Sequence, residues 1–575
     1  MNSMLQALIT AAIFVVADKT QLVNAENRQT IAPVIPESAL LTTISQSKPN
    51  ILLILADDVG TGDIPSWWNT TSLVDMPNIN RLMSMGVKFT DAHSTPLCAP
   101  SRYMLLSGNY QHRGERPKGS WDMSETGNQF LSYQKSLAQH LKDGAGYSTS
   151  MFGKWHLGNM PRGLMNSTHI LSGNNWEKPL LEGPGDIGFE TSFVSLGGIQ
   201  SPPYSFFRDD MLTTKPTDIV YWKEGKYKRP HGKSRIKKNE GEGDVDWDST
   251  AYNMILVNET IRFIDNHVEQ EDDDVPFFAY VALGSVHIPH SPADFYLDGS
   301  PIANQHQTRH LDMLSEMDKV VGSLVSMIED RGLAEDTIII FSSDNGGLRY
   351  SERFSHETSG PLRDAKASIY EGGHRIPLVM RYDKVFPGGE SRDNLLGLND
   401  MYATLSDLVG IDSASIPHGS AQDSISFADH ITNENNKDGL RNELAHWEYR
   451  KKNVPIHAIR FDNFKMVHFP ENGTAALYDL NDDISETRDL SDDETYRDKI
   501  EMMYLRLQDL GPCPTEGSSS KRVQLENGWN ITCKWFTKKK AQKRCGQFVE
   551  ASTHCGKVCR KTGWCNSYFP KLMQV

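Results

Sequence analysis

Short apolar runs that end in polar residues most constrain how this chain can fold. Residues 49–60 read PNILLILADDVG, and similar runs occupy residues 275–290 (VPFFAYVALGSVHIPH) and 336–347 (DTIIIFSSDNGG). A continuous apolar run of this length is typical of a strand buried on both faces. Residues 308–332 between two such runs have apolar side chains at helical spacing. Alternating strands and helices predict an α/β fold with a large, mostly parallel sheet sandwiched by helices.

Each apolar run delivers polar side chains at its carboxyl end. Asp57 and Asp58 follow the first run, His287 the second, and Asp344 and Asn345 the third. Ligands of open α/β sheets bind at this edge, so we expect a single site there. The acids and the amide offer only oxygen, which suits Ca²⁺ or Mg²⁺ rather than zinc. One acidic pair could be a solvated loop, but two pairs at two strand ends favour a metal site.

Composition divides the 575 residues into five parts. Residues 1–17 hold an apolar run ending in small residues, which predicts a signal peptide; the alternative, a membrane anchor, is weaker because the run is short for a span. Residues 18–47 are polar and aperiodic, as in a tether. Residues 48–440 form the large α/β domain. Short strands packed closely in sequence predict a smaller antiparallel α+β domain at 441–510. Residues 511–575 form a basic, six-cysteine module.

The cysteines predict an oxidising compartment. Six of the seven lie between Cys513 and Cys565, which suggests three disulfides with 15 possible pairings. Five Asn-x-Ser/Thr sequons agree with a secreted glycoprotein. Cys98 is left over, and a free thiol in such a compartment is a liability unless chemistry consumes it. The sequons are at Asn69, Asn166, Asn258, Asn472 and Asn530.

Charge is distributed unevenly along the chain. Residues 513–575 carry 12 Lys and Arg against 3 Glu, in a chain whose net charge is −15. A second basic stretch, KEGKYKRPHGKSRIKK, occupies residues 223–238. Both stretches could bind a polyanion such as a sulfated polysaccharide, or could be solvated basic surfaces. We expect neither a nucleic-acid partner nor stable membrane insertion.

The segment around Cys98 resembles a known signature. Cys98-x-Pro100-Ser101-Arg102 followed by YMLLSG is similar to the first signature of the formylglycine sulfatases, and GYSTSMFGKWHLG (146–158) is similar to the second. LADDVGTGD, SSDNGG, PLRDAKASIYEGGHRIP and LYDLNDD extend the resemblance over residues 49–510. The chain is thereby identified as a member of the type I sulfatases of the alkaline phosphatase superfamily.

The resemblance implies a sulfuric ester hydrolase that acts on aryl sulfates and on sulfated carbohydrate. In this family a formylglycine-generating enzyme oxidises the cysteine, here Cys98, to Cα-formylglycine, whose hydrate is the nucleophile. Asp57, Asp58, Asp344 and Asn345 match the metal ligands, and calcium is the usual metal, with magnesium the alternative. The apolar N-terminal run, the sequons and the cysteines predict the secretory pathway or an extracellular location, with a lysosome-like compartment as an alternative.

The resemblance also implies roles for five further side chains. Arg102 would hold the formylglycine, and Lys154 would bridge it and the sulfate. His156 would take the proton of the hemiacetal when sulfate leaves. His287 and Lys366 would bind sulfate and help to protonate the leaving oxygen.

The sequence departs from the family pattern at several points. Ser107 stands where Thr is usual, Val286 where Pro is common, and Thr61 where an aromatic residue is common.

Two further functional residues are expected. Asp344, beside the metal, would be the base for the attacking hydroxyl. A further family serine should lie near FVSLGGIQSPPY (193–204), but spacing does not identify it.

Two alternatives remain open. A phosphonate monoester hydrolase or phosphodiesterase of the same superfamily would share the metal site, but such enzymes often use transition metals and extra histidines. A non-catalytic, secreted carbohydrate-binding homologue would lack site residues, whereas the matched positions are all present.

Overall fold

The computed structural model describes residues 48–69, 73–116, 121, 127–158, 176–223, 225–228, 235–270, 275–349, 356–433, 435–436, 439–450, 454–511, 522–524 and 530–532. The predicted signal peptide, the tether and all six tail cysteines lie outside these residues.

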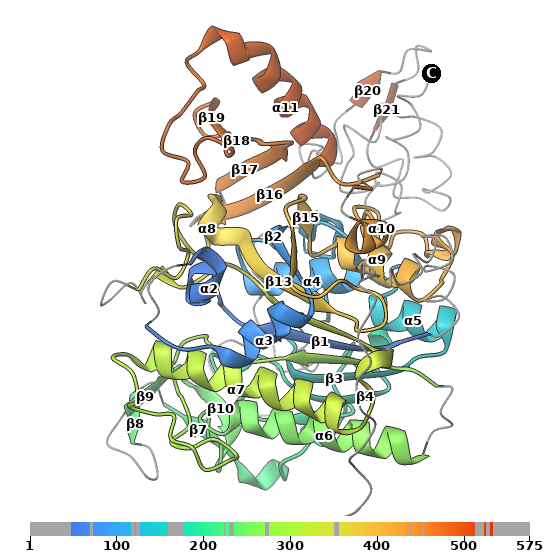
Figure 1. Ribbon diagram of the computed structural model, residues 1–575, viewed down its shortest axis with the longest axis vertical. Helices are drawn as coiled ribbons and strands as arrows, with labels where there is room; N and C mark the ends of the chain where they lie inside the picture. The colour runs from blue at the N-terminus through green and yellow to red at the C-terminus, as the bar shows by residue number, and fades with distance from the viewer. Residues whose placement is uncertain are drawn as a thin grey trace, which may run out of the picture.

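A large central sheet is the core of the α/β domain (Figure 1). Its strand order is β14-β2-β13-β12-β1-β11-β3-β4-β5-β6, and β15 pairs with β2. From β12 through β4 neighbouring strands are parallel, whereas β13 runs antiparallel to both β12 and β2. The mostly parallel sheet predicted from the sequence is confirmed. The strands are β1 (Asn50–Ala56), β2 (Val87–His93), β3 (Ser148–Lys154), β4 (Thr191–Ser195), β5 (Phe207–Arg208), β6 (Met211–Leu212), β11 (Phe277–Ala282), β12 (Thr337–Ser343), β13 (Arg375–Arg381), β14 (Glu390–Arg392) and β15 (Leu396–Gly397).

Helices cover both faces of this sheet, as its continuous apolar strands require. Side chains of β1 alternate between two separate cores: Ile51, Leu53 and Leu55 pack with residues of α4, α5 and α9, whereas Leu52 and Ile54 pack with residues of α3, α6 and α7. Figure 1 shows α6 and α7 side by side on one side of the sheet. The helices of the domain are α2 (Pro65–Trp68), α3 (Pro77–Met85), α4 (Cys98–Ser107), α5 (Leu137–Ala145), α6 (Tyr252–Gln270), α7 (Arg309–Asp330), α8 (Glu371–His374), α9 (Asp400–Leu408) and α10 (Ala428–Thr432).

Local sequence explains where several helices begin and end. Ser136 and Thr308 cap α5 and α7, because each side-chain oxygen accepts a hydrogen bond from a backbone N–H of the first turn. Helix α4 ends at Gly108, which has a φ of 68°. A Cβ at this glycine would lie 2.6 Å from Ala421 Cα, so the turn after α4 needs glycine for both its conformation and its space.

A smaller α+β unit follows in sequence, as expected. Strands β16 (Glu443–Arg450), β17 (Val454–Phe461), β18 (Phe464–Phe469) and β19 (Thr474–Asp479) form an antiparallel sheet. Helix α11 (Arg497–Leu510) lies across it at the top of Figure 1. Met503 and Leu507 of α11 are buried in the same core as α4 and α9, so the unit packs directly on the α/β domain.

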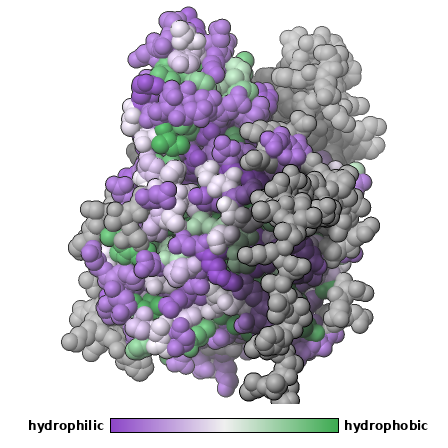
Figure 2. All heavy atoms as spheres, viewed as in Figure 1, coloured by the Kyte–Doolittle hydropathy of each residue, from purple (hydrophilic) through white to green (hydrophobic). Residues whose placement is uncertain are grey.

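Further two-stranded antiparallel sheets lie outside the two larger sheets. The basic stretch 223–238 contains two paired strands, β8 (Gly225–Lys228) and β9 (Arg235–Lys238), beside the pair β7 (Ile219–Trp222) and β10 (Gly241–Asp244). Strands β20 (Arg522–Gln524) and β21 (Asn530–Thr532) pair in the tail. Among the described helices none has the length and apolarity of a membrane span. The face drawn in Figure 2 is mainly hydrophilic, with separate small apolar spots.

Candidate active site

The strand ends bring the predicted polar residues to one edge of the sheet. Strand β1 leads into Asp57 and Asp58, β11 leads to His287, and β12 leads to Asp344 and Asn345. Strands β12, β1 and β11 are direct neighbours and parallel, so their carboxyl ends lie side by side. Parallel pairing of β3 with β11 adds Lys154 and His156 at the same edge. The polar residues that follow these strands therefore lie together at one edge of the sheet.

Cys98 is the first residue of α4 and points into this site. Cys98 is 4% exposed, and its Sγ lies 3.2 Å from His156 Nδ1. The Sγ position stands for the oxygen that a formylglycine would carry on its Cβ. No side chain caps α4, so the positive end of the helix dipole would favour an anion next to residue 98. Burial raises the pKa of the thiol, which is a poor nucleophile as it stands.

Four oxygen-bearing side chains converge beside Cys98. Asp57 Oδ1, Asp58 Oδ2 and Asn345 Oδ1 are buried and accept no hydrogen bond. Leaving three buried oxygen acceptors unpaired costs free energy unless a cation binds them. Asp344 completes the set, because its Oδ1 accepts only the Asp58 backbone N–H, at 3.2 Å, among the described bonds. The donor set fits a hard divalent cation.

Buried cations surround these carboxylates. Arg102 donates from Nη2 to Asp344 Oδ2 at 2.6 Å and from Nη1 to the Lys154 carbonyl at 3.0 Å. Lys154 Nζ donates to Asp57 Oδ2 at 2.7 Å. Lys366 Nζ forms an ion pair with Asp58. The carboxylates thus fix the positions of the cations, and the cations face the same space as Cys98.

His287 also reaches the acidic cluster. Its Nε2 lies 3.5 Å from Asp58 Oδ2, and its Nδ1 lies 2.5 Å from the Ile288 carbonyl. The carbonyl can only accept, so Nδ1 carries a proton and Nε2 of the neutral ring faces the site.

The surroundings lower the pKa of the histidines of this site and raise the pKa of one of its aspartates. Burial, together with the neighbouring Lys154 and Arg102, holds the pKa of His156 well below its usual value. Burial likewise lowers the pKa of His287 to about 3, although Asp58 opposes this. Burial, followed by the charge of Asp57, raises the pKa of Asp344 to about 6. Both imidazoles are therefore neutral at neutral pH and can accept protons.

The structure also shows site residues that the sequence did not reveal. Gln200 Oε1 accepts a hydrogen bond from Lys154 Nζ at 3.0 Å. Gln200 belongs to the segment in which a further family serine was expected. Ser195 of that segment instead pairs with the Tyr252 hydroxyl, at 2.7 Å. A glutamine two positions before a Pro-Pro pair carries no recognisable signal in the sequence.

A second missed group supports the loop after β1. Asp63 Oδ1 accepts hydrogen bonds from His310 Nε2 and His356 Nε2, each at 2.8 Å. Its Oδ2 accepts the Gly60 backbone N–H at 2.8 Å, which holds the turn after Asp58. These histidines lie far from Asp63 in sequence, so only the fold brings them together.

Comparisons with known proteins agree on one family. The family model described as Sulfatase matches residues 49–411, and one described as N-sulphoglucosamine sulphohydrolase, C-terminal, matches residues 364–511. An N-acetylgalactosamine-6-O-sulfatase of Bacteroides thetaiotaomicron is 28% identical over 528 residues, covering 81% of this chain and 96% of its own. The N-acetylgalactosamine-6-sulfatase of Sus scrofa is 27% identical over 68% of each chain.

A solved structure shows the same architecture. It comes from work on the metabolism of multiple glycosaminoglycans by Bacteroides thetaiotaomicron and superimposes with a TM-score of 0.66 at 25% identity. The match covers 81% of this chain and 99% of the solved one. The basic tail after residue 511 lies outside both family matches.

Proposed function

Because the chain belongs to the sulfatase family and hydrolyses sulfate esters, we propose that it removes sulfate groups from carbohydrates with a nucleophile made from Cys98. The observation that carries this proposal is the position of Cys98 Sγ, 3.2 Å from His156 Nδ1 and within 4.8 Å of carboxylate oxygens of Asp57 and Asp344, which buried cations contact. That arrangement suits an anionic ester, whose attack needs charge neutralisation.

Asp57, Asp58, Asp344 and Asn345 hold a divalent cation in this proposal. Calcium suits the oxygen-only donor set better than magnesium, which demands stricter octahedral geometry and keeps more of its water. The bound cation supplies positive charge that neutralises the sulfate group and favours the ionised form of a hydroxyl beside it.

Each remaining side chain has one task at residue 98 or at the sulfate. Arg102 fixes the position of the formylglycine, while Lys154 bridges residue 98 and the sulfate. One hydroxyl of the aldehyde hydrate bonds to sulfur as the alcohol leaves, with its proton passing to Asp344. The negative charges of the bound sulfate and of Asp58 would favour a proton on His287 Nε2 in the complex, so His287 and Lys366 would hold the sulfate and protonate the leaving oxygen. His156 then accepts the proton of the second hydroxyl, so that sulfate leaves and the aldehyde is restored.

The names of the relatives guide the choice of substrate. Two relatives are named as sulfatases of N-acetylgalactosamine 6-sulfate. We therefore expect a sulfated amino sugar or its polysaccharide as substrate, with aryl sulfates cleaved as small surrogates. Maturation needs a formylglycine-generating enzyme, and the apolar start of the chain together with the cysteine-rich tail favours the secretory pathway.

The decisive experiment joins mass spectrometry to a substrate panel. The protein is produced together with a formylglycine-generating enzyme. The mass of the tryptic peptide 89–102 is then measured to detect an aldehyde at residue 98. Aryl sulfate, N-acetylgalactosamine 6-sulfate and an aryl phosphodiester are then assayed in parallel. Cys98→Ala, which keeps the helix but cannot be oxidised to the aldehyde, is the matched control.

The outcomes separate the alternatives. An aldehyde with sulfate release that Cys98→Ala abolishes supports the proposal. Preference for the phosphodiester would favour a phosphonate or phosphodiester hydrolase. An unmodified Cys98 in active preparations, or an aldehyde without turnover on any sulfated sugar, would refute the proposed nucleophile or substrate respectively.

A further inference from the structure

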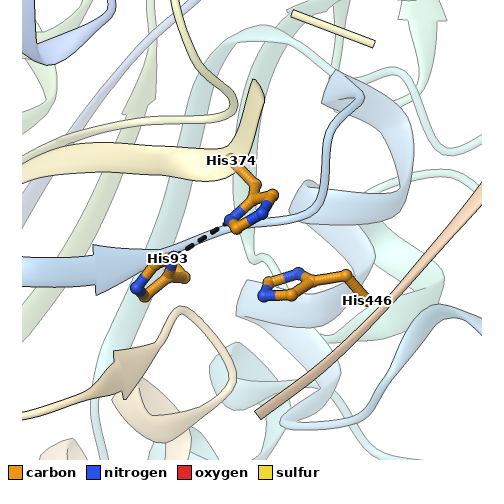
Figure 3. A group of neighbouring side chains, drawn as sticks. All are labelled: His93, His374 and His446. Carbon is orange, nitrogen blue, oxygen red and sulfur yellow. Dashed lines mark hydrogen bonds between the residues drawn. The ribbon is translucent and has the colours of Figure 1, made fainter. Parts of the chain in front are cut away.

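Three buried histidines meet where the C-terminal sheet packs on the α/β domain. His93 ends β2, His374 ends α8, and His446 lies on β16 of the C-terminal sheet (Figure 3). Their exposed fractions are 0%, 0% and 2%. One ring nitrogen from each lies within 4.8 Å of the other two. None of the three has a task in the sulfatase site.

Hydrogen bonds around two of these rings direct a lone pair into the cluster. His93 Nε2 lies 2.9 Å from Asp91 Oδ1, an acceptor, so Nε2 carries the proton and Nδ1 is free to coordinate. His374 Nε2 lies 3.1 Å from the Ile369 carbonyl; in the tautomer that donates to this carbonyl, His374 Nδ1 is also free to coordinate. The two Nδ1 atoms face each other at 3.0 Å. Two lone pairs at that distance repel unless a proton or a metal ion lies between them.

His446 supplies an unpaired nitrogen to the same place. Its Nε2 is buried and has no hydrogen-bond partner. Its ring stacks on that of His374, with centroids 3.8 Å apart, and Figure 3 shows it reaching toward the other two rings. A buried imidazole nitrogen without a partner is costly, and a metal ion would remove that cost.

We propose that His93, His374 and His446 form a second metal site, specific for zinc-like ions and distinct from the oxygen site. Zinc–nitrogen bonds of about 2.05 Å in a tetrahedron place ligand nitrogens about 3.3 Å apart, close to the Nδ1–Nδ1 distance already present. The His446 ring turns out of its stack to complete three ligands, and water takes the fourth position.

The surroundings suit a structural ion. Burial lowers the pKa of all three histidines, so the rings are neutral, as ligands must be. Asp91 orients His93 from outside, an arrangement common for zinc-bound histidine. Nearby charged side chains form ion pairs in which their charges cancel, among them Asp91 with Arg460 and Glu371 with Lys465. Neutral imidazoles favour zinc over calcium.

The ion would fasten the C-terminal unit to segments that carry catalytic residues. His93 lies five residues before Cys98, and His374 lies eight residues after Lys366. The His374 carbonyl accepts the Ser94 backbone N–H at 2.8 Å, so these two segments are already joined. Zinc would add β16 to that junction and so stabilise the interface. The proposal does not depend on which sulfate ester the enzyme cleaves.

A competing arrangement needs no metal. Lys465 Nζ lies 3.2 Å from His374 Nε2 and can only donate. If Nε2 accepts this bond, His374 Nδ1 carries the proton and donates it to His93 Nδ1. The internal hydrogen bond would then replace the ion, and experiment separates the two arrangements.

The test measures zinc in the full-length protein with calcium in excess, so that the oxygen site is filled. Oxidised protein is stripped with a chelator, dialysed against calcium, and titrated with zinc. We compare wild type with His446→Gln, which keeps most of the volume but removes the imidazole, and with His468→Gln as a control from the same sheet. Zinc content, the zinc-dependent rise in melting temperature, and X-ray absorption at the zinc edge are recorded.

We expect about one bound zinc in wild type and in His468→Gln, and at least tenfold weaker binding in His446→Gln, since even outer-sphere changes weaken zinc sites 10- to 100-fold. X-ray absorption should show imidazole scattering and no sulfur. Zinc bound equally by His446→Gln, sulfur ligands from the tail, or no zinc in folded wild type would each overturn the proposal. If His446→Gln fails to fold, the wild-type zinc content and ligand spectrum still decide.

Discussion

Replacing His156 by glutamine separates the two halves of the proposed reaction. His156 Nδ1 lies 3.2 Å from Cys98 Sγ, and no other described side chain forms a hydrogen bond with Cys98 Sγ. Glutamine nearly fills the same volume but cannot accept a proton at neutral pH. The residue is 6% exposed, so bulk water is a poor substitute for the missing base.

The magnitude follows from the role. Loss of a positioned general base typically slows a step by 10²- to 10⁴-fold, which at about 1.36 kcal/mol per factor of ten is about 3 to 5 kcal/mol of barrier. The first half, attack on sulfur and departure of the alcohol, does not use His156. An aryl sulfate should therefore release about one equivalent of alcohol in a rapid burst, followed by slow turnover.

The assay is stopped-flow detection of the aryl alcohol under excess substrate, with the aldehyde content of each preparation measured by mass spectrometry. His140→Gln, at a buried histidine of α5 outside the site, serves as the matched control and should keep normal turnover. A His156→Gln enzyme that loses the burst as well as turnover, at full aldehyde content, would refute the assignment of His156 to sulfate release. Unchanged kcat would refute any role as base.

Three further results are expected. Removing the divalent cation, proposed to be calcium, with a chelator should abolish activity reversibly and lower the melting temperature, since a ligand at about 100 times its Kd stabilises the fold by about 2.7 kcal/mol; unchanged melting would contradict the oxygen site. Asp210→Asn should stabilise the protein by up to about 2 kcal/mol at pH 7.5 but not at pH 5, after allowing for partial exposure. Burial and the charge of Asp186 raise the pKa of Asp210 in the folded protein to about 6. Between the ordinary pKa of an aspartate and about 6, the folded state therefore binds more protons than the unfolded state, and stability falls as pH rises. Equal melting shifts at both pH values would contradict this reasoning. Neutralising the basic residues of 223–238 and of the tail should raise KM for a sulfated polysaccharide while sparing small aryl sulfates, and equal losses on both would contradict a polyanion-binding role.

The sequence determined the local pattern of the fold and indicated which polar residues lie together at one edge of the central sheet. Strand length, apolar runs and helical spacing depend on neighbouring residues, so they predicted β1, β11, β12 and α7 directly. The rule that parallel strands end at one edge then placed Asp57 and Asp344 together before any distance was known. Resemblance to a family supplied the rest of the site, including Cys98 and Lys366.

Tertiary structure alone decided which distant side chains meet. Gln200 beside Lys154, the two histidines on Asp63, and the cluster of His93 with His374 and His446 depend on strand order and on the docking of β16. Each of these residues is ordinary in its own stretch of sequence. Contacts across hundreds of residues are set by the register of the sheet and the packing of whole units, whereas periodicity reports only which face of one element is buried.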